Sequence, residues 1–154
     1  MAPYASVEQF LAYYGTDRVR TSVPKDVLTT DLEDHLLVRL ESVSGYMDSY
    51  LVRGGYATPV DPSLLSDITA QERLESLLAE VCCALVGQQL FTGQRGTGEG
   101  QKQARNWAKD WLEDIAAGRN TIAGLAKTSK RIAVVGTADP SIPDTLFSSI
   151  RYPF

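Results

Sequence analysis

The chain has 154 residues, of which 44% are hydrophobic and 22% are charged, and its formal net charge is −4. These values are typical of one globular domain and exclude wholesale disorder. The longest unbroken apolar run, residues 81–86, is far shorter than the roughly 20 residues of a membrane-spanning helix. The N-terminus lacks the features of a signal peptide, so we expect a soluble protein made in the cytoplasm.

Positive and negative charges are distributed unevenly along the chain. Residues 1–94 hold 6 Lys/Arg and 13 Asp/Glu, a net charge of −7, whereas residues 95–154 hold 9 and 6, a net charge of +3. No acidic residue lies between Ile115 and Ala138. An acidic body with a basic C-terminal segment can attract copies of itself or an acidic partner, although a solvated basic loop would carry the same charge.

The N-terminal residues predict a short helix over residues 6–14. Ser6 and Gln9 form a capping-box pattern, in which each side chain binds a backbone N–H of the first turn. An apolar stripe follows, and Gly15 stands where a left-handed residue can end the helix. Residues 16–29 are polar and contain Pro24, so we expect a connecting loop there.

A second, long helix is predicted over residues 31–53. Thr30 and Glu33 form another capping-box pattern, and Gly54 and Gly55 end the helix. Its apolar stripe has spacings of three and four residues and consists of Leu32, Leu36, Leu40, Val43, Met47 and Tyr50.

Residues 69–91 form the stretch around which we expect the fold to be organised. Thr69 and Glu72 form a third capping-box pattern, and residues 81–86 are apolar on every side of the predicted helix. Such a helix must be covered by other helices. Cys82 and Cys83 are sequence neighbours whose side chains point about 100° apart on a helix, so we expect buried, reduced thiols rather than a disulfide.

A fourth helix is predicted over residues 100–117, with Trp107 and Trp111 on its apolar stripe and Gly118 closing it. We expect both tryptophans to pack in the core. The preceding glycines at positions 93, 96, 98 and 100 follow a helix, and their spacing matches neither phosphate-binding loop, which both follow a strand. This stretch is therefore interpreted as a linking loop. Residues 54–68 are interpreted as a turn-rich connection.

No catalytic, cofactor or metal site is predicted. His35 is the only histidine, and no second histidine stands at a metal-binding spacing, so we expect a surface histidine. The sequence also contains no G-x-S-x-G nucleophile pattern. We therefore expect a protein that is not an enzyme and that uses no cofactor.

The segment after Gly118 differs in character from the rest. Residues 131–135 predict one short strand, and residues 139–154 hold three prolines among large apolar side chains. We expect such a segment to pack against a protein surface, either in this chain or in another chain. The fold class expected is an all-α bundle of about four helices over residues 1–118 with an extended docking tail over residues 119–154. Candidate docking residues are Arg119, Lys127, Lys130, Arg131, Ile132, Val134, Phe147, Ile150, Tyr152 and Phe154.

Three stretches resemble the Mu-like phage gp36 family of small virion proteins, a domain of unknown function. They are YASVEQFLAYYG at residues 4–15, GYMDSYLVRGGYATPV at 45–60 and WLEDIAAGRNTI at 111–122. Over residues 4–122 the layout is similar to helical head–tail connector, or adaptor, proteins of tailed phages. The resemblance implies a homo-oligomeric ring, twelvefold, between the portal protein and tail or neck proteins of the virion, with DNA passing through its channel.

The residues themselves are compatible with this expectation. A subunit of such an assembly needs rigid helices and no catalytic centre, and an acidic body suits a DNA channel because like charges keep phosphates from sticking. The alternatives are a DNA-binding helical module, a tail-completion protein of the neck, and an enzyme that uses the glycine-rich loop. A DNA-binding module would need a basic helix, whereas the basic segment here lies outside the long predicted helices.

Overall fold

The computed structural model describes residues 2–23, 31–91 and 99–128, and the side chains of the last helix from Trp107 onward. All regular structure within these residues is helical: α1 (Val7–Tyr14), α2 (Thr16–Ser22), α3 (Leu32–Arg53), the 3-10 helix η1 (Pro62–Leu64), α4 (Ile68–Phe91) and α5 (Glu99–Ala116). The predicted all-α class is therefore confirmed for the described part of the chain. The predicted strand at 131–135 lies outside the described residues.

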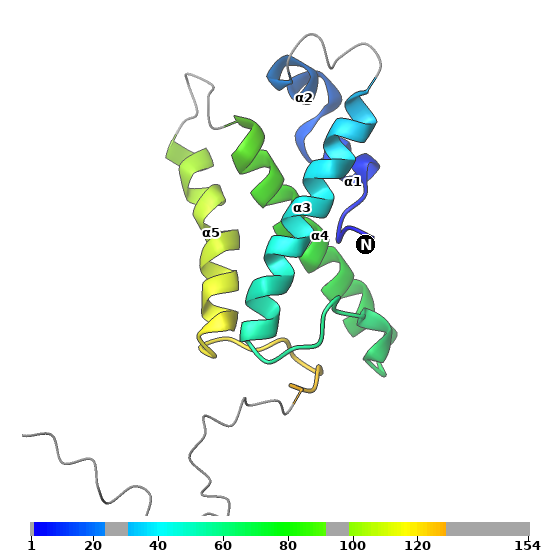
Figure 1. The fold of residues 1–154 in the computed structure, drawn as a ribbon, viewed down its shortest axis with the longest axis vertical. Coiled ribbons are helices and arrows are strands. Elements are labelled where there is room, and N and C mark those ends of the chain that lie inside the picture. The colour runs from blue at the N-terminus through cyan, green and yellow to red at the C-terminus, as the bar shows by residue number, and fades with distance from the viewer. Residues whose placement is uncertain (1, 24–30, 92–98, 129–154) are drawn as a thin grey trace, which may run out of the picture.

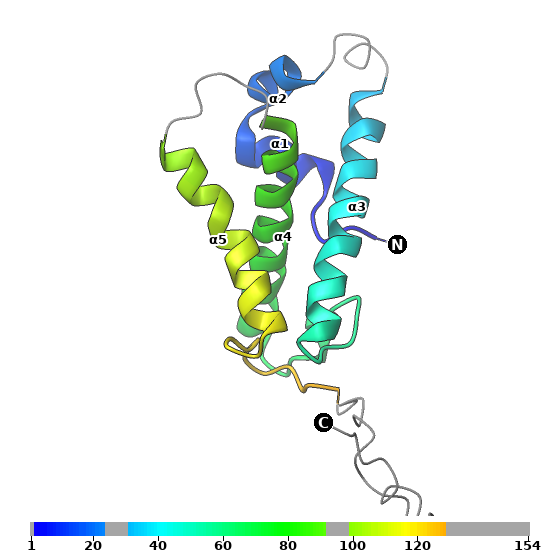
Figure 2. The same cartoon turned by 60° about the vertical axis from the view of Figure 1, so that its left-hand side comes forward.

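The three long helices, α3, α4 and α5, pack on one another, and α1 packs on α3 and α4 (Figure 1). Helices α1 and α2 lie together near the end of the bundle where α3 begins and α4 ends. The chain after α5 runs beneath the opposite end, beside the α3–α4 connection (Figure 2). Helix α4 is thus covered by helices of its own chain.

Helix α1 begins as the sequence predicts, but the loop predicted after it is partly wrong. The Ser6 hydroxyl accepts the Gln9 N–H at 3.1 Å, and the Gln9 side chain accepts the Ser6 N–H at 2.8 Å. Gly15 ends the helix with a φ of +83°. Helix α2 then starts at once and buries Val19 completely. A helix of seven residues with one buried side chain has no apolar stripe, which is why periodicity misses it.

The starts of α3 and α4 differ from the predicted capping boxes. Asp31 is the N-cap of α3 and its side chain makes no capping bond. Helix α4 begins at Ile68, and the Asp67 carboxylate accepts the Thr69 N–H at 3.1 Å. Thr69 therefore lies inside the helix that it was predicted to cap, because a carboxylate two residues earlier satisfies the unpaired N–H first.

The core forms around the middle of α4, where residues 81–87 are all buried. The predicted stripe of α3 is buried from Leu36 to Met47, but Leu51 rather than Tyr50 completes it. In α5, Leu112 and Ile115 are fully buried, and both tryptophans pack at the edge of the core. Helix α4 is long and apolar enough to cross a membrane by composition, but 61% of its most apolar 18 residues are buried inside the fold.

The end of α3 lies close to α5 at Gly54, the C-cap of α3. A Cβ atom at this position would lie 2.8 Å from both Cγ2 and the carbonyl oxygen of Ile115. The lack of a side chain therefore allows the end of α3 to rest directly on the last turn of α5. The same contact brings the segment after α5 next to the α3–α4 connection.

Candidate functional site

Two of the residues predicted to dock on a partner are described, and both contact their own chain. Arg119 donates to the Asp114 carboxylate from Nε at 2.8 Å and from Nη2 at 2.7 Å. Lys127 lies over the Tyr56 aromatic ring, with Nζ 5.7 Å from its centroid. The other eight lie outside the described residues: Lys130, Arg131, Ile132, Val134, Phe147, Ile150, Tyr152 and Phe154.

Residues 119–128, the start of the predicted tail, pack on the helical body. The buried Ile122 N–H donates to the Tyr56 hydroxyl at 2.8 Å. The Thr128 N–H and hydroxyl both donate to the Gly55 carbonyl, at 2.7 Å and 2.9 Å. Leu65 packs against Gly124, where an added Cβ would lie 2.6 Å from the Leu65 Cδ2 and where φ is +84°. The described part of the tail is therefore fastened to the α3–α4 connection by buried and directional contacts.

An apolar groove lies between α4, α5 and this segment. We call it the α4–α5 groove, and its volume is about 250 Å³. Helix α4 lines it at positions spaced three and four residues apart, and Trp111 forms the opposite wall. Arg73 is the only charged side chain among its lining residues, which are Ala70, Arg73, Leu74, Leu77, Trp111, Thr121, Ile122 and Ala123.

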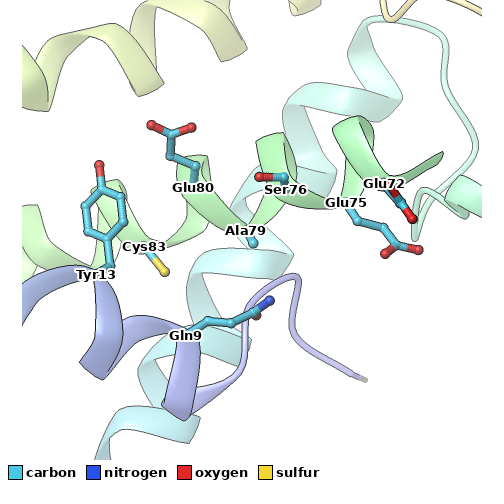
Figure 3. Close-up of a pocket in the computed structure, with 8 residues that line it drawn as sticks. All are labelled: Gln9, Tyr13, Glu72, Glu75, Ser76, Ala79, Glu80 and Cys83. Atoms are coloured by element: carbon cyan, nitrogen blue, oxygen red, sulfur yellow. The ribbon is translucent and has the colours of Figure 1, made fainter. Parts of the chain in front are cut away.

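A second groove, between α1 and α4, is acidic (Figure 3). Glu72, Glu75 and Glu80 line it from α4, and Gln9 and Tyr13 line it from α1, around about 450 Å³. Burial, followed by the negative charge of Glu80, raises the pKa of Tyr13. The three glutamates are exposed, so this groove repels polyanions.

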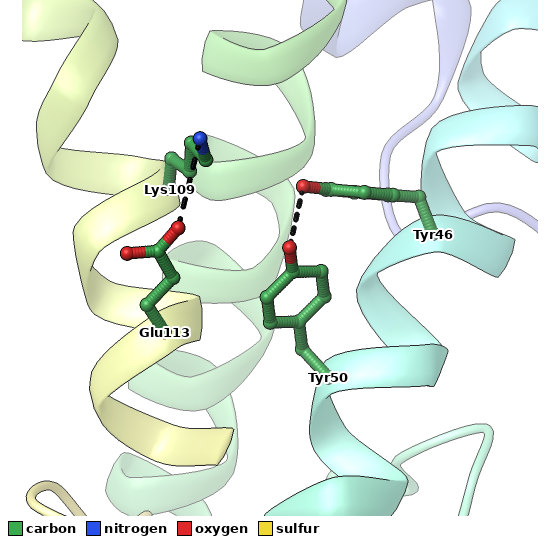
Figure 4. Close-up of polar contacts among 4 residues, drawn as sticks. All are labelled: Tyr46, Tyr50, Lys109 and Glu113. Carbon is green, nitrogen blue, oxygen red and sulfur yellow. Dashed lines mark hydrogen bonds and ion pairs between the residues drawn. The ribbon is translucent and has the colours of Figure 1, made fainter. Parts of the chain in front are cut away.

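On a third surface, α3 and α5 each carry a polar contact between side chains four residues apart in the same helix (Figure 4). The Tyr46 hydroxyl donates to the Tyr50 hydroxyl at 2.9 Å, and Lys109 pairs with Glu113 at 3.6 Å. The hydrogen bond to Tyr50, followed by burial and by the charges of Tyr50 and Glu113, raises the pKa of Tyr46 to about 12. The Tyr46 hydroxyl is therefore protonated at neutral pH and acts as a hydrogen-bond donor at this surface.

The cysteines have the chemistry of core residues. Cys82 and Cys83 are buried and free, as the sequence predicts. Burial raises the pKa of Cys82 to about 11 and that of Cys83 to about 12. Because the thiolate is the reactive form, burial and a raised pKa make both thiols less reactive than an exposed cysteine.

His35 is half-buried rather than fully exposed, and the Arg39 Nε donates to its Nε2 at 2.9 Å. Burial, and then the positive charge of Arg39, lowers the pKa of His35. Within the described residues, no three His, Cys, Asp or Glu side chains are grouped as metal ligands. The predicted linking loop at 93–100 lies mostly outside the described residues, and only its last two residues are seen, in the first turn of α5.

Sequence reasoning missed a polar network that fastens the N-terminus to α3. The Tyr4 hydroxyl donates to Asp48 at 2.5 Å and accepts the Val60 N–H at 2.9 Å, while the Tyr4 N–H donates to Ser44 at 2.9 Å. Burial, then the hydrogen bond to Asp48, raises the pKa of Tyr4 well above its usual value. The sequence signal for this network is the position of two polar residues beside the apolar stripe of α3. Ser44 directly follows the buried Val43, and Asp48 directly follows the buried Met47.

Comparison of the chain with protein-family models, with curated protein sequences and with solved structures finds no match. The resemblance to the gp36 family therefore rests on the three sequence stretches at residues 4–15, 45–60 and 111–122. The structure places these stretches in α1, in the end of α3 with the loop after it, and in the end of α5 with the segment after it.

Proposed function

We propose that this chain is a structural subunit of the head–tail connector of a tailed phage, present in the neck of the virion as one copy of a homo-oligomeric assembly. In this role it contacts the portal protein on one side and tail or neck proteins on the other, and DNA passes through the central channel. The sequence resemblance suggests twelve copies.

The observation that carries the proposal is the arrangement of basic and acidic side chains in the helical body. The basic side chains of Arg18, Arg53 and Lys127 lie over aromatic rings, and those of Lys109 and Arg119 pair with carboxylates. The carboxylates of the acidic groove are exposed. Exposed carboxylates, together with basic side chains that mostly contact groups of their own chain, favour passage of DNA over retention, because phosphates are repelled.

The helical architecture supports the same role. The core of the described residues is assembled from all five α-helices of one chain, so the subunit does not need a partner to cover its central helix. The remaining contact surfaces are the outer faces of the helices, the grooves and the C-terminal segment. A rigid body with separate contact surfaces suits an assembly in which each copy touches two neighbours.

A DNA-binding helical module is the main alternative. It would require Lys or Arg side chains that are aimed at phosphates from one helix face. Six of the eight described basic side chains instead face aromatic rings, carboxylates or, in the case of Arg39, His35; the other two are Arg20 and Arg73. This arrangement favours the connector over the DNA-binding module.

The test is assembly with the portal protein of the same phage. The full chain is mixed with purified portal assemblies, and the product is analysed by mass photometry and electron microscopy. We expect a second layer of density on one face of the portal and a mass increase of several subunits. A chain that leaves the portal unchanged but shifts duplex DNA in a salt-sensitive manner would instead identify a DNA-binding protein.

A further inference from the structure

We infer that the α4–α5 groove is the receptor for residues 146–154 of a second copy of this chain. This inference deepens the proposed function and rests on it, because it names the contact through which neighbouring subunits join. The occupant is the apolar end of the tail, with Phe147 as its main anchor.

The groove has the size and chemistry of a receptor for side chains. Its volume of about 250 Å³ is below the roughly 300–1,000 Å³ of pockets that hold drug-sized molecules, but large enough for one or two side chains. Ala70, Leu77 and Trp111 contribute partly buried apolar surface, and burying it against an aromatic side chain removes apolar area from water. Ala123 is exposed at the edge of the groove.

The sequence outside the described residues supplies a matching occupant. Residues 146–154 read LFSSIRYPF, which places Leu146, Phe147, Ile150, Tyr152 and Phe154 within nine positions. Such density of large apolar groups is typical of a buried segment rather than a solvated one. Proline at position 153 is compatible with an extended peptide that lies in a groove.

Residues 146–154 carry Arg151 and no acidic residue, so any ion pair with the groove involves a residue just before this segment. Arg73 is exposed among the lining residues of the groove. Asp144 is the acidic residue nearest to Phe147 in the sequence. An ion pair between Arg73 and Asp144 would be exposed and would add little affinity, but it would set the register of the peptide in the groove.

The length of the segment allows it to reach a second copy. The described chain ends at Thr128, which is fastened to Gly55, and Phe147 follows 19 residues later. Those residues span up to roughly 63 Å when extended, whereas α4, the longest helix with 24 residues, is about 36 Å long. The segment can therefore reach beyond its own body to the groove of a neighbour.

The test is photo-crosslinking in the full chain with the photoreactive residue p-benzoylphenylalanine at position 147. Light and isotopically heavy copies are mixed, irradiated and analysed by mass spectrometry. We expect heavy–light crosslinks from position 147 to residues of the α4–α5 groove, with Leu77, Trp111 and Ala123 as the main acceptors. Crosslinks only within one copy, crosslinks to another surface, or no crosslinked pairs would each overturn the inference.

A pair of matched variants gives an independent readout. Ala123→Arg fills the groove at an exposed alanine, and Ala12→Arg makes the same change at an exposed alanine on α1. We expect Ala123→Arg to weaken self-association in sedimentation velocity at least tenfold and Ala12→Arg to leave it unchanged; equal effects would overturn the inference. If the chain associates with itself through the groove but does not bind the portal, the proposed function alone is contradicted. If Ala123→Arg leaves portal binding unchanged and the crosslinks lie elsewhere, the inference alone is contradicted.

Discussion

The Tyr14 aromatic ring lies against Gly87, in the space that a Cβ atom at position 87 would occupy. The ring also contacts those of Phe10 and Phe91, with centroids 5.1 Å and 5.0 Å away. The Arg18 guanidinium lies 4.7 Å from the centroid of Phe91. Helices α1 and α2 are therefore held on the C-terminal half of α4 by an aromatic cluster that requires glycine at one position.

Gly87→Ala should destabilise the protein. Overpacking costs about 1–3 kcal/mol, and the helical preference of alanine returns up to about 1 kcal/mol, so a net loss is expected. The matched control is Gly45→Ala in α3, where nothing lies within 4 Å of the added Cβ. That variant should gain up to about 1 kcal/mol. Urea unfolding followed by circular dichroism compares the two, and shifts in the same direction would contradict the packing seen at Gly87.

Tyr4→Phe should lower the free energy of unfolding by about 1–3 kcal/mol, because it leaves the Val60 N–H and the Asp48 carboxylate without a partner. Tyr46→Phe makes the same chemical change at a side chain that is 41% exposed. Its effect should stay within about 0.5 kcal/mol, because water replaces the lost bond to Tyr50. Thermal and urea unfolding of both variants provide the measurement, and equal losses would show that the Tyr4 network does not fasten the N-terminus.

Two truncations separate the described part of the tail from the rest. Deletion of residues 129–154 removes none of the described contacts, so the helical content and the cooperative unfolding should persist. Deletion of residues 119–154 also removes Ile122, which is only 7% exposed, and its bond to Tyr56. The second truncation should lose more than about 2 kcal/mol relative to the first, because a buried isoleucine leaves the core. Identical urea midpoints would place residues 119–128 outside the folded unit.

The thiols of Cys82 and Cys83 should be protected from alkylation at pH 8. Both are buried, and their raised pKa values keep the reactive thiolate scarce in the folded chain. Iodoacetamide labelling should therefore follow the urea unfolding curve. The full chain in 6 M urea serves as the fully reactive control, and fast labelling in native buffer would refute the burial.

The same thiols predict a loss of stability at alkaline pH. Well below the ordinary thiol pKa of 9.0, both are protonated in the folded and unfolded chains. As the pH rises further, the unfolded chain releases these protons, whereas the folded chain keeps them until about pH 11 for Cys82 and about pH 12 for Cys83. The free energy of unfolding should therefore fall from pH 9 upward. The Cys82→Ala/Cys83→Ala variant should show a shallower decline between pH 9 and 10, and an unchanged slope would exclude the thiols as the cause.

The sequence by itself determined the long helices and the central position of α4. Apolar side chains at three- and four-residue spacings, with Gly54 and Gly55 as a stop, predicted α3, and the all-round apolar middle of α4 predicted buried, reduced cysteines. These signals are local, because a helix brings residues three and four positions apart onto one face. The uneven distribution of charge along the sequence likewise identified Arg119 and Lys127 as candidate docking residues.

Only the tertiary structure decided how these helices meet and which surfaces remain. Helix α2 carries too few apolar residues to be recognised locally, and the Tyr4 bond to Asp48 joins residues 44 positions apart. The fit of Tyr14 on Gly87, the attachment of Thr128 to Gly55 and the α4–α5 groove also combine distant segments. Such contacts depend on the register between helices, which is set by close packing of side chains from several elements and is not encoded in the periodicity of any one of them.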